Sequence, residues 1–250
     1  MADDGATTSE SGAVVRELEF DRTQVGYEYE SLIVPFVLVA GISLATCIAA
    51  GVEIFALFHQ LQLFKDAAAG VFASPAALSI AATQNDKFLS MAALAYTMIS
   101  LSALVFGGVW IYRASANVRT FGATGFSISP GWAVGWNFVP LMGFFMPYVA
   151  MSETWRATFQ PARWQSARSG VLLPVWWGTW LGTILMGNIS RIFSRVETTV
   201  ETVVDTTQFE IVRAALQVVC FALFVAITFR VTQVQSVRHA DVLDAEKTFG

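Results

Sequence analysis

The chain has 250 residues, of which 55% are hydrophobic and only 14% charged, and its mean hydropathy is +0.56. Soluble domains are about one-quarter charged, so this composition predicts an integral membrane protein. The formal net charge is −4, and no stripe of basic residues offers the phosphate neutralisation that nucleic-acid binding needs. Nucleic acid is therefore not an expected partner.

The first thirty residues form an acidic leader that holds eight of the nineteen Asp and Glu residues. A secretory signal peptide has a basic start, a short apolar stretch and a small-residue cleavage site, and the leader shows none of these features. Its first dozen residues offer almost no apolar surface to bury. We therefore expect residues 1–30 to be a partly disordered tail on the cytoplasmic side of a membrane.

Four long apolar runs follow the leader, at 31–58, 88–112, 171–189 and 211–229. A helix rises about 1.5 Å per residue, so each run can cross a hydrocarbon core of about 30 Å. The sequence thus predicts an all-α integral membrane protein whose membrane domain, residues 31–235, has four transmembrane helices. Residues 236–250 are then a cytoplasmic C-terminal tail.

The loops between these runs differ in their content of Lys and Arg, which sets the orientation of a multi-pass protein. With four spans and the N-terminus inside, the cytoplasmic basic residues are Arg16, Arg22, Arg113, Arg119, Arg156, Arg163, Arg168, Arg230, Arg238 and Lys247. The opposite side keeps only Lys65, Lys87, Arg191 and Arg195. This asymmetry predicts that both termini lie in the cytoplasm.

A further apolar segment, 126–159, lies between the second and third runs and reads FSISPGWAVGWNFVPLMGFFMPYVAMSETWRATF. Pro130, Pro140 and Pro147 interrupt it, and each lacks the N–H group that a continuous helix would use. Proline is favoured in the first turn of a helix. We therefore expect one short helical piece before Pro140 and a second piece that begins near Pro147.

The second helical piece has an amphipathic pattern, with apolar residues at spacings of four and three. Its apolar face holds Phe144, Tyr148, Met151, Trp155 and Phe159. Ser152, Glu153 and Arg156 fall on the other face, and such a helix lies in the headgroup region with its apolar face down. The segment is thus predicted to be a Pro-broken re-entrant or interfacial element on the cytoplasmic side. A kinked fifth span is the alternative.

Four stretches in the middle of the chain resemble a known family. They are WIYRASANVRTFG, SPGWAVGWNFVP, MPYVAMSETWRA and WWGTWLGTILMGNISRI. Together they resemble the bacterial multi-pass membrane proteins known as domain-of-unknown-function family 4328. The resemblance covers residues 110–192 and implies a protein of the bacterial inner membrane, but it implies no activity. Asn137 stands where the family pattern has an aromatic residue, and LMGFF replaces a more polar turn, so no shared polar site is expected there.

Charged and aromatic residues in and beside segment 126–159 are candidates for binding a partner or a lipid. Glu153 could pair with Arg113 or Arg119 to dock the segment, or the arginines could face lipid phosphates. Ordinary anchoring on the cytoplasmic side is the simpler interpretation of the arginines. Tryptophan and tyrosine suit a surface with one apolar and one wet edge. The predicted partner- or lipid-binding residues are Arg113, Arg119, Trp132, Trp136, Tyr148, Glu153, Trp155 and Arg156.

Two charged residues within the apolar runs, Glu53 and Arg213, are candidate buried polar groups. Glu53 could pair with His59 or carry a proton, but a carboxylate in the outer half of a span can also extend toward the outer surface. Arg213 follows Glu210 at a spacing of three, which allows an ion pair on one helix face. We expect that face to point into the helix bundle.

No catalytic, cofactor or metal site is predicted. The only cysteines, Cys47 and Cys220, lie in apolar runs, and two histidines, His59 and His239, cannot supply a bis-histidine intramembrane haem or a convincing zinc site. No nucleophile elbow, zinc-protease motif or phosphate-binding glycine loop occurs. The sequence favours a non-catalytic scaffold or accessory subunit in the lipid bilayer that binds a membrane-protein partner or lipid headgroups. The alternative is a small transporter or channel built as a homo-oligomer.

Overall fold

The computed structural model describes residues 26–193 and 200–249 of the chain. Within these residues it contains helices and no strand, which confirms the all-α prediction. The elements are α2 (Ile33–Ala68), α3 (Pro75–Thr120), α4 (Pro130–Gly135), the 3-10 helices η1 (Trp136–Phe138) and η2 (Met142–Phe144), α5 (Met146–Phe159), the 3-10 helix η3 (Pro161–Arg163), α6 (Leu172–Phe193) and α7 (Val200–Phe249). Most of the acidic leader, residues 1–25, lies outside the described part.

Three of these helices, α2, α3 and α7, are long and apolar enough to cross a membrane. The chain is thus a multi-pass membrane protein. Helix α6 occupies the third predicted apolar run, but it has only 22 residues and is not among these three helices.

The three long helices extend well beyond the apolar runs that mark them in the sequence. Helix α7 has 50 residues, which corresponds to a length of about 75 Å, more than twice the thickness of a hydrocarbon core. Residues 236–249, predicted as a separate tail, are the last turns of this helix. They contain good helix formers and neither Pro nor Gly, so nothing ends the helix where the apolar run ends.

The start of α3 carries clear local signals. Pro75 is at the first helical position, and the Ser74 side chain accepts a hydrogen bond from the Ala77 N–H at 3.2 Å. Proline suits this position because its missing N–H would have no partner there, and a serine cap satisfies one of the free amides. These residues start a new helix after α2, although both helices are apolar.

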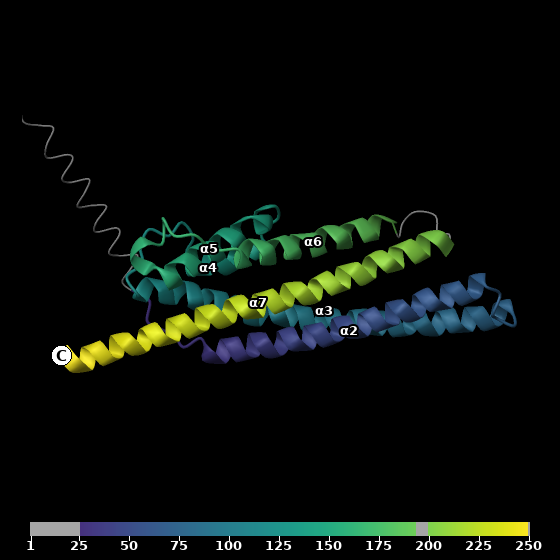
Figure 1. The fold of residues 1–250 in the computed structure, drawn as a ribbon, viewed down its shortest axis with the longest axis horizontal. Coiled ribbons are helices and arrows are strands. Elements are labelled where there is room, and N and C mark those ends of the chain that lie inside the picture. The colour runs from purple at the N-terminus through teal and green to yellow at the C-terminus, as the bar shows by residue number, and fades with distance from the viewer. Residues whose placement is uncertain (1–25, 194–199, 250) are drawn as a thin grey trace, which may run out of the picture.

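The helices form an elongated bundle in which α2 and α3 are antiparallel neighbours, α7 packs along α2, and α6 packs along α7 (Figure 1). The beginning of α2 and the end of α7 lie at the same end of the bundle (Figure 1). We call this end the terminal end. The core is richest toward this end, where Trp110, Met151, Leu173, Trp177 and Ile227 belong to one buried cluster.

Candidate functional site

Segment 126–159 forms a hairpin that starts and finishes at the terminal end. At its start, the Arg119 guanidinium donates a hydrogen bond to the Ile128 carbonyl at 2.7 Å. Just beyond its finish, the Trp164 indole N–H donates to the Thr124 carbonyl, also at 2.7 Å. Both flanks of the segment are therefore held at the same level of the bundle, and we refer to this element as the hairpin.

The prolines shape the hairpin as the sequence predicts. Pro130 lies in the first turn of α4, and Pro147 lies in the first turn of α5. Pro140 follows the end of η1, where the chain becomes extended at Val139. Leu141 then adopts a positive φ of 64°, a conformation that turns the chain back but strains a residue with a side chain. The prediction of two short helical pieces is confirmed.

The tip of the hairpin exposes a group of large apolar side chains. They are Phe138, Leu141, Met142, Phe144 and Phe145. On the inner side, the hairpin approaches α3 so closely that a Cβ atom on Gly108 would lie 3.2 Å from the Val134 side chain. Glycine therefore lets α4 pack close to the middle of α3.

Helix α5 is buried on its polar face as well as on its apolar one, which its amphipathic pattern did not predict. Ser152, Glu153 and Thr154 are as buried as Met151. The polar face points into the bundle because α7 supplies partners for it: the Gln235 amide donates to the Thr158 hydroxyl at 2.9 Å. The spacing of residues identified the two faces correctly but could not show what covers them.

Glu153 ties the two arms of the hairpin together. Its carboxylate accepts hydrogen bonds from the Ser127 backbone N–H, at 3.2 Å, and from the Ser127 hydroxyl. The ion pair of Glu153 with Arg113 or Arg119, which was one of two interpretations of these residues, is not formed. Arg113 instead pairs with Glu30 at 2.7 Å, and Arg119 donates to Ser115 and to the Ile128 carbonyl.

The remaining predicted binding residues differ widely in exposure. Trp132 is 53% exposed, whereas Trp155 is 8% exposed and packs against Phe159 with ring centroids 4.7 Å apart. Trp136, Tyr148 and the arginines are half-buried. Trp155 and Glu153 are consequently parts of the hairpin's packing. Among the predicted binding residues, only the more exposed ones can contact a partner directly.

A polar hollow of about 430 Å³ lies beside the C-terminal half of α5. It is lined by Ser152, Arg156, Ala167, Arg168, Ser169, Gly170 and Val171. The Arg156 guanidinium lies over the Trp164 ring, 5.2 Å from its centroid, and donates to the Ser152 carbonyl at 3.1 Å. Arg168 is exposed. Sequence reasoning placed Arg168 on the cytoplasmic side but not at a site, because the loop that brings it to Arg156 has no periodic pattern.

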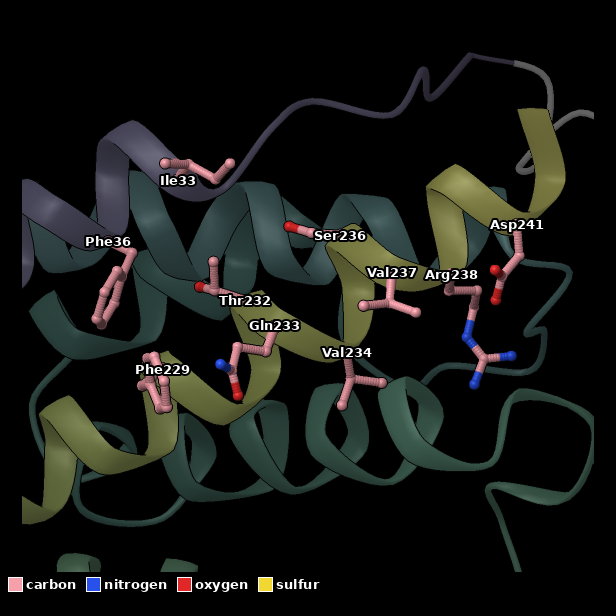
Figure 2. Close-up of a pocket in the computed structure, with 10 residues that line it drawn as sticks. All are labelled: Ile33, Phe36, Phe229, Thr232, Gln233, Val234, Ser236, Val237, Arg238 and Asp241. Carbon is pink, nitrogen blue, oxygen red and sulfur yellow. The ribbon is translucent and has the colours of Figure 1, made fainter. Parts of the chain in front are cut away.

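A larger open hollow of about 840 Å³ lies between the start of α2 and the last third of α7 (Figure 2). At one end of it, the rings of Phe36 and Phe229 have centroids 5.7 Å apart. Arg238 and Asp241 lie at the other end (Figure 2). The wall thus changes from aromatic to charged along α7, as expected near the edge of a bilayer.

A buried cluster of charges joins α2 to α7 farther from the terminal end. The Arg213 guanidinium contacts the Glu53 carboxylate at 2.7 Å and also pairs with Glu210. Glu53 is only 8% exposed, and its second oxygen has no hydrogen-bond partner among the described residues. Glu53 therefore does not extend to the surface, and His59 contacts Asn85 at 2.9 Å instead of Glu53. The predicted Glu210–Arg213 pair is confirmed.

The comparisons with known proteins address the family and not the chemistry. The profile of one family, described as a domain of unknown function (DUF4328), matches residues 73–233, from just before α3 to the last third of α7. No curated protein and no solved structure matches the chain. The matched region includes the hairpin, the hollow beside α5, α6 and Arg213, and it covers more than half of the sequence. The chain therefore belongs to the DUF4328 family.

Proposed function

We propose that this protein spans the bacterial inner membrane four times, with both termini in the cytoplasm and the hairpin re-entering from the cytoplasmic face. The alternation of α2, α3, α6 and α7 along the bundle supports four crossings, since the start of α2 and the end of α7 share one end (Figure 1). The excess of Lys and Arg assigned to that end supports its cytoplasmic position.

Within this topology, the protein acts as a non-catalytic scaffold or accessory subunit that binds the phosphate groups of anionic lipids through its cytoplasmic end. One observation carries the proposal: the hollow beside α5 brings together Arg156, Arg168 and the hydroxyl residues Ser152 and Ser169. Guanidinium groups bind phosphate through paired, charge-assisted hydrogen bonds. In the described part of the chain, neither arginine is paired with a carboxylate, so both charges can serve a ligand.

The test is a double substitution, Arg156→Gln with Arg168→Gln, followed by analysis of the lipids that copurify in mild detergent. Because each basic residue near an anionic surface contributes about 1 kcal/mol, enrichment of anionic lipid should fall by about tenfold or more. Lys65→Gln with Lys87→Gln is the matched control, since it removes two exposed charges at the other end of the bundle. Unchanged enrichment in the arginine variant would reject the headgroup site.

A scaffold role also predicts a protein partner. Purification from native membranes should then yield a second membrane protein in fixed ratio to this chain, and crosslinking with mass spectrometry should place it near the cytoplasmic end. A chain that always purifies alone would argue against an accessory subunit.

The buried charges favour one second candidate, a small oligomeric transporter or channel. Glu53, Arg213 and Glu210 bring two carboxylates and one guanidinium together between helices, and ionisable groups at such depth often belong to ion or proton pathways. This candidate requires a symmetric homo-oligomer and solute or ion flux in liposomes that is lost in Glu53→Gln. Absence of flux in the wild-type protein would remove it.

A further inference from the structure

The hairpin creates an apolar groove along the lipid-facing side of α3. The groove has a volume of about 650 Å³, and its walls include Leu101, Leu104, Val105 and Val109 of α3 and Phe138 of the hairpin. Each of these side chains is more than 40% exposed. An apolar trough of this kind, open toward the membrane, accepts a hydrocarbon chain without any rearrangement.

Behind the groove lies a second cavity of about 420 Å³, inside the bundle. Its lining includes three tryptophans of α6, Trp176, Trp177 and Trp180, together with Phe221 and Phe224 of α7. The groove and the cavity have four lining residues in common, Leu101, Leu104, Gly108 and Val134. They therefore meet at one boundary between α3 and the hairpin, where Gly108 contributes no side chain.

The cytoplasmic end of the groove carries one ion pair. The Arg113 guanidinium contacts the Glu30 carboxylate at 2.7 Å, with side chains 35% and 51% exposed respectively. Both residues line the groove, and Tyr112 lies beside them. This pair presents a cation and an anion side by side, each partly open to solvent, and is therefore complementary to a headgroup that itself carries one charge of each sign.

The dimensions along α3 match one leaflet of a bilayer. Arg113 and Leu104 are nine residues apart, which is about 14 Å of helix, and one leaflet of a hydrocarbon core is about 15 Å thick. A lipid whose headgroup lies at Arg113 therefore places the end of its chain near Leu104, where the groove meets the cavity.

From these observations we propose that the groove binds a phosphatidylethanolamine molecule of the cytoplasmic leaflet. Its phosphate contacts Arg113, its ammonium group contacts Glu30, and one acyl chain follows α3 to the mouth of the aromatic cavity. Phosphatidylglycerol has an uncharged glycerol where this pose places an ammonium group, and the quaternary ammonium of phosphatidylcholine has no N–H to donate to Glu30. This site is separate from the Arg156 and Arg168 hollow and shares none of its residues.

The experiment reconstitutes the full chain in vesicles of equal parts phosphatidylethanolamine, phosphatidylglycerol and phosphatidylcholine, and quantifies the lipids retained after extraction in mild detergent. Wild-type protein should retain phosphatidylethanolamine in preference to phosphatidylcholine, whereas phosphatidylglycerol retention reports the separate Arg156 and Arg168 hollow. Glu30→Gln should lower that preference by about tenfold, because a charge-assisted hydrogen bond is lost. Val105→Trp should abolish it by filling the groove, whereas Met98→Trp, on an exposed α3 residue outside the groove, should not.

Two results would overturn the proposal: equal retention of phosphatidylethanolamine and phosphatidylcholine by the wild type, or undiminished preference for phosphatidylethanolamine in both Glu30→Gln and Val105→Trp. A different result would reject the Arg156 and Arg168 hollow as a lipid site: the double variant Arg156→Gln with Arg168→Gln would leave phosphatidylglycerol retention unchanged. Glu30 is at the surface and its backbone is held by Asn117 through hydrogen bonds of 2.9 and 2.8 Å, so Glu30→Gln should fold normally even if Val105→Trp does not.

Discussion

At the residue scale, the charges between α2 and α7 show how an apolar bundle can hold charged side chains that are costly to remove from water. Glu53 and Arg213 are separated by 160 positions yet contact each other at 2.7 Å. A charge removed from water costs several kcal/mol, and a well-aligned partner offsets much of that cost. Removing one partner therefore lowers the free energy of unfolding more than replacing both partners by apolar residues would.

We therefore predict that Arg213→Gln destabilises the protein by about 3–5 kcal/mol, because it leaves the carboxylates of Glu53 and Glu210 buried without a cation. Glu53→Gln should cost clearly less, since an amide oxygen can still accept from Arg213 while Glu210 keeps its charge. Thermal unfolding in detergent compares the two variants. If both variants melted at the temperature of the wild-type protein, the ion pair would contribute little to stability.

The sequence identified Glu53 and Arg213 as buried polar groups and placed Arg213 beside Glu210, because that spacing lies within one helix. It could not pair Glu53 with Arg213. Spacing carries information only inside a helix, and contacts between α2 and α7 depend on how the whole bundle packs. For the same reason, the pairing of Arg113 with Glu30 could not be foreseen.

At the element scale, Glu153 connects the two arms of the hairpin. It bridges α5 to the start of the hairpin through Ser127. We predict that Glu153→Ala, which removes the acceptor, loosens residues 126–130, and that Glu153→Gln, which retains an acceptor oxygen, does so less. Hydrogen exchange of these backbone amides is the measurement. Unchanged protection in Glu153→Ala would show that packing alone holds the hairpin.

The proposed re-entrant path makes a second prediction, for a chain in which both native cysteines have been replaced by serine. Single cysteines at Thr124 and Ser166 should react with a membrane-impermeant maleimide only in inverted vesicles, because both positions flank the hairpin on its cytoplasmic side. A cysteine at Phe145, which is 67% exposed at the tip, should react from neither side because it faces lipid. Reaction of Thr124 and Ser166 from opposite sides would establish a full span instead.

Prolines made the two arms of the hairpin predictable, since each proline limits the backbone locally. The burial of the polar face of α5 was not predictable in the same way. Thr158 and Gln235 meet only because α7 passes α5 near the terminal end, and nothing in residues 126–159 encodes that neighbour.

At the scale of the whole molecule, the proposed four-span arrangement predicts on which side of the membrane the ends of the chain lie. Reporter domains fused after residue 20 and after Asp241 should both report a cytoplasmic location, since the basic residues gather at the terminal end. An external location for either one would exclude four crossings. The apolar runs predicted the positions of the three long apolar helices, but not their lengths, because polar residues end the apolar part of a helix without ending the helix.

The contact of α5 with α7 also constrains the order in which the protein can be assembled during translation. The hairpin precedes α6 and α7 in the chain, yet Thr158 receives hydrogen bonds from Gln235 and from Arg238, at 2.9 and 3.3 Å. Those partners leave the ribosome after α6. Until α7 has been made, Thr158 lacks these two partners, so the end of the hairpin settles only after α7 has been synthesised.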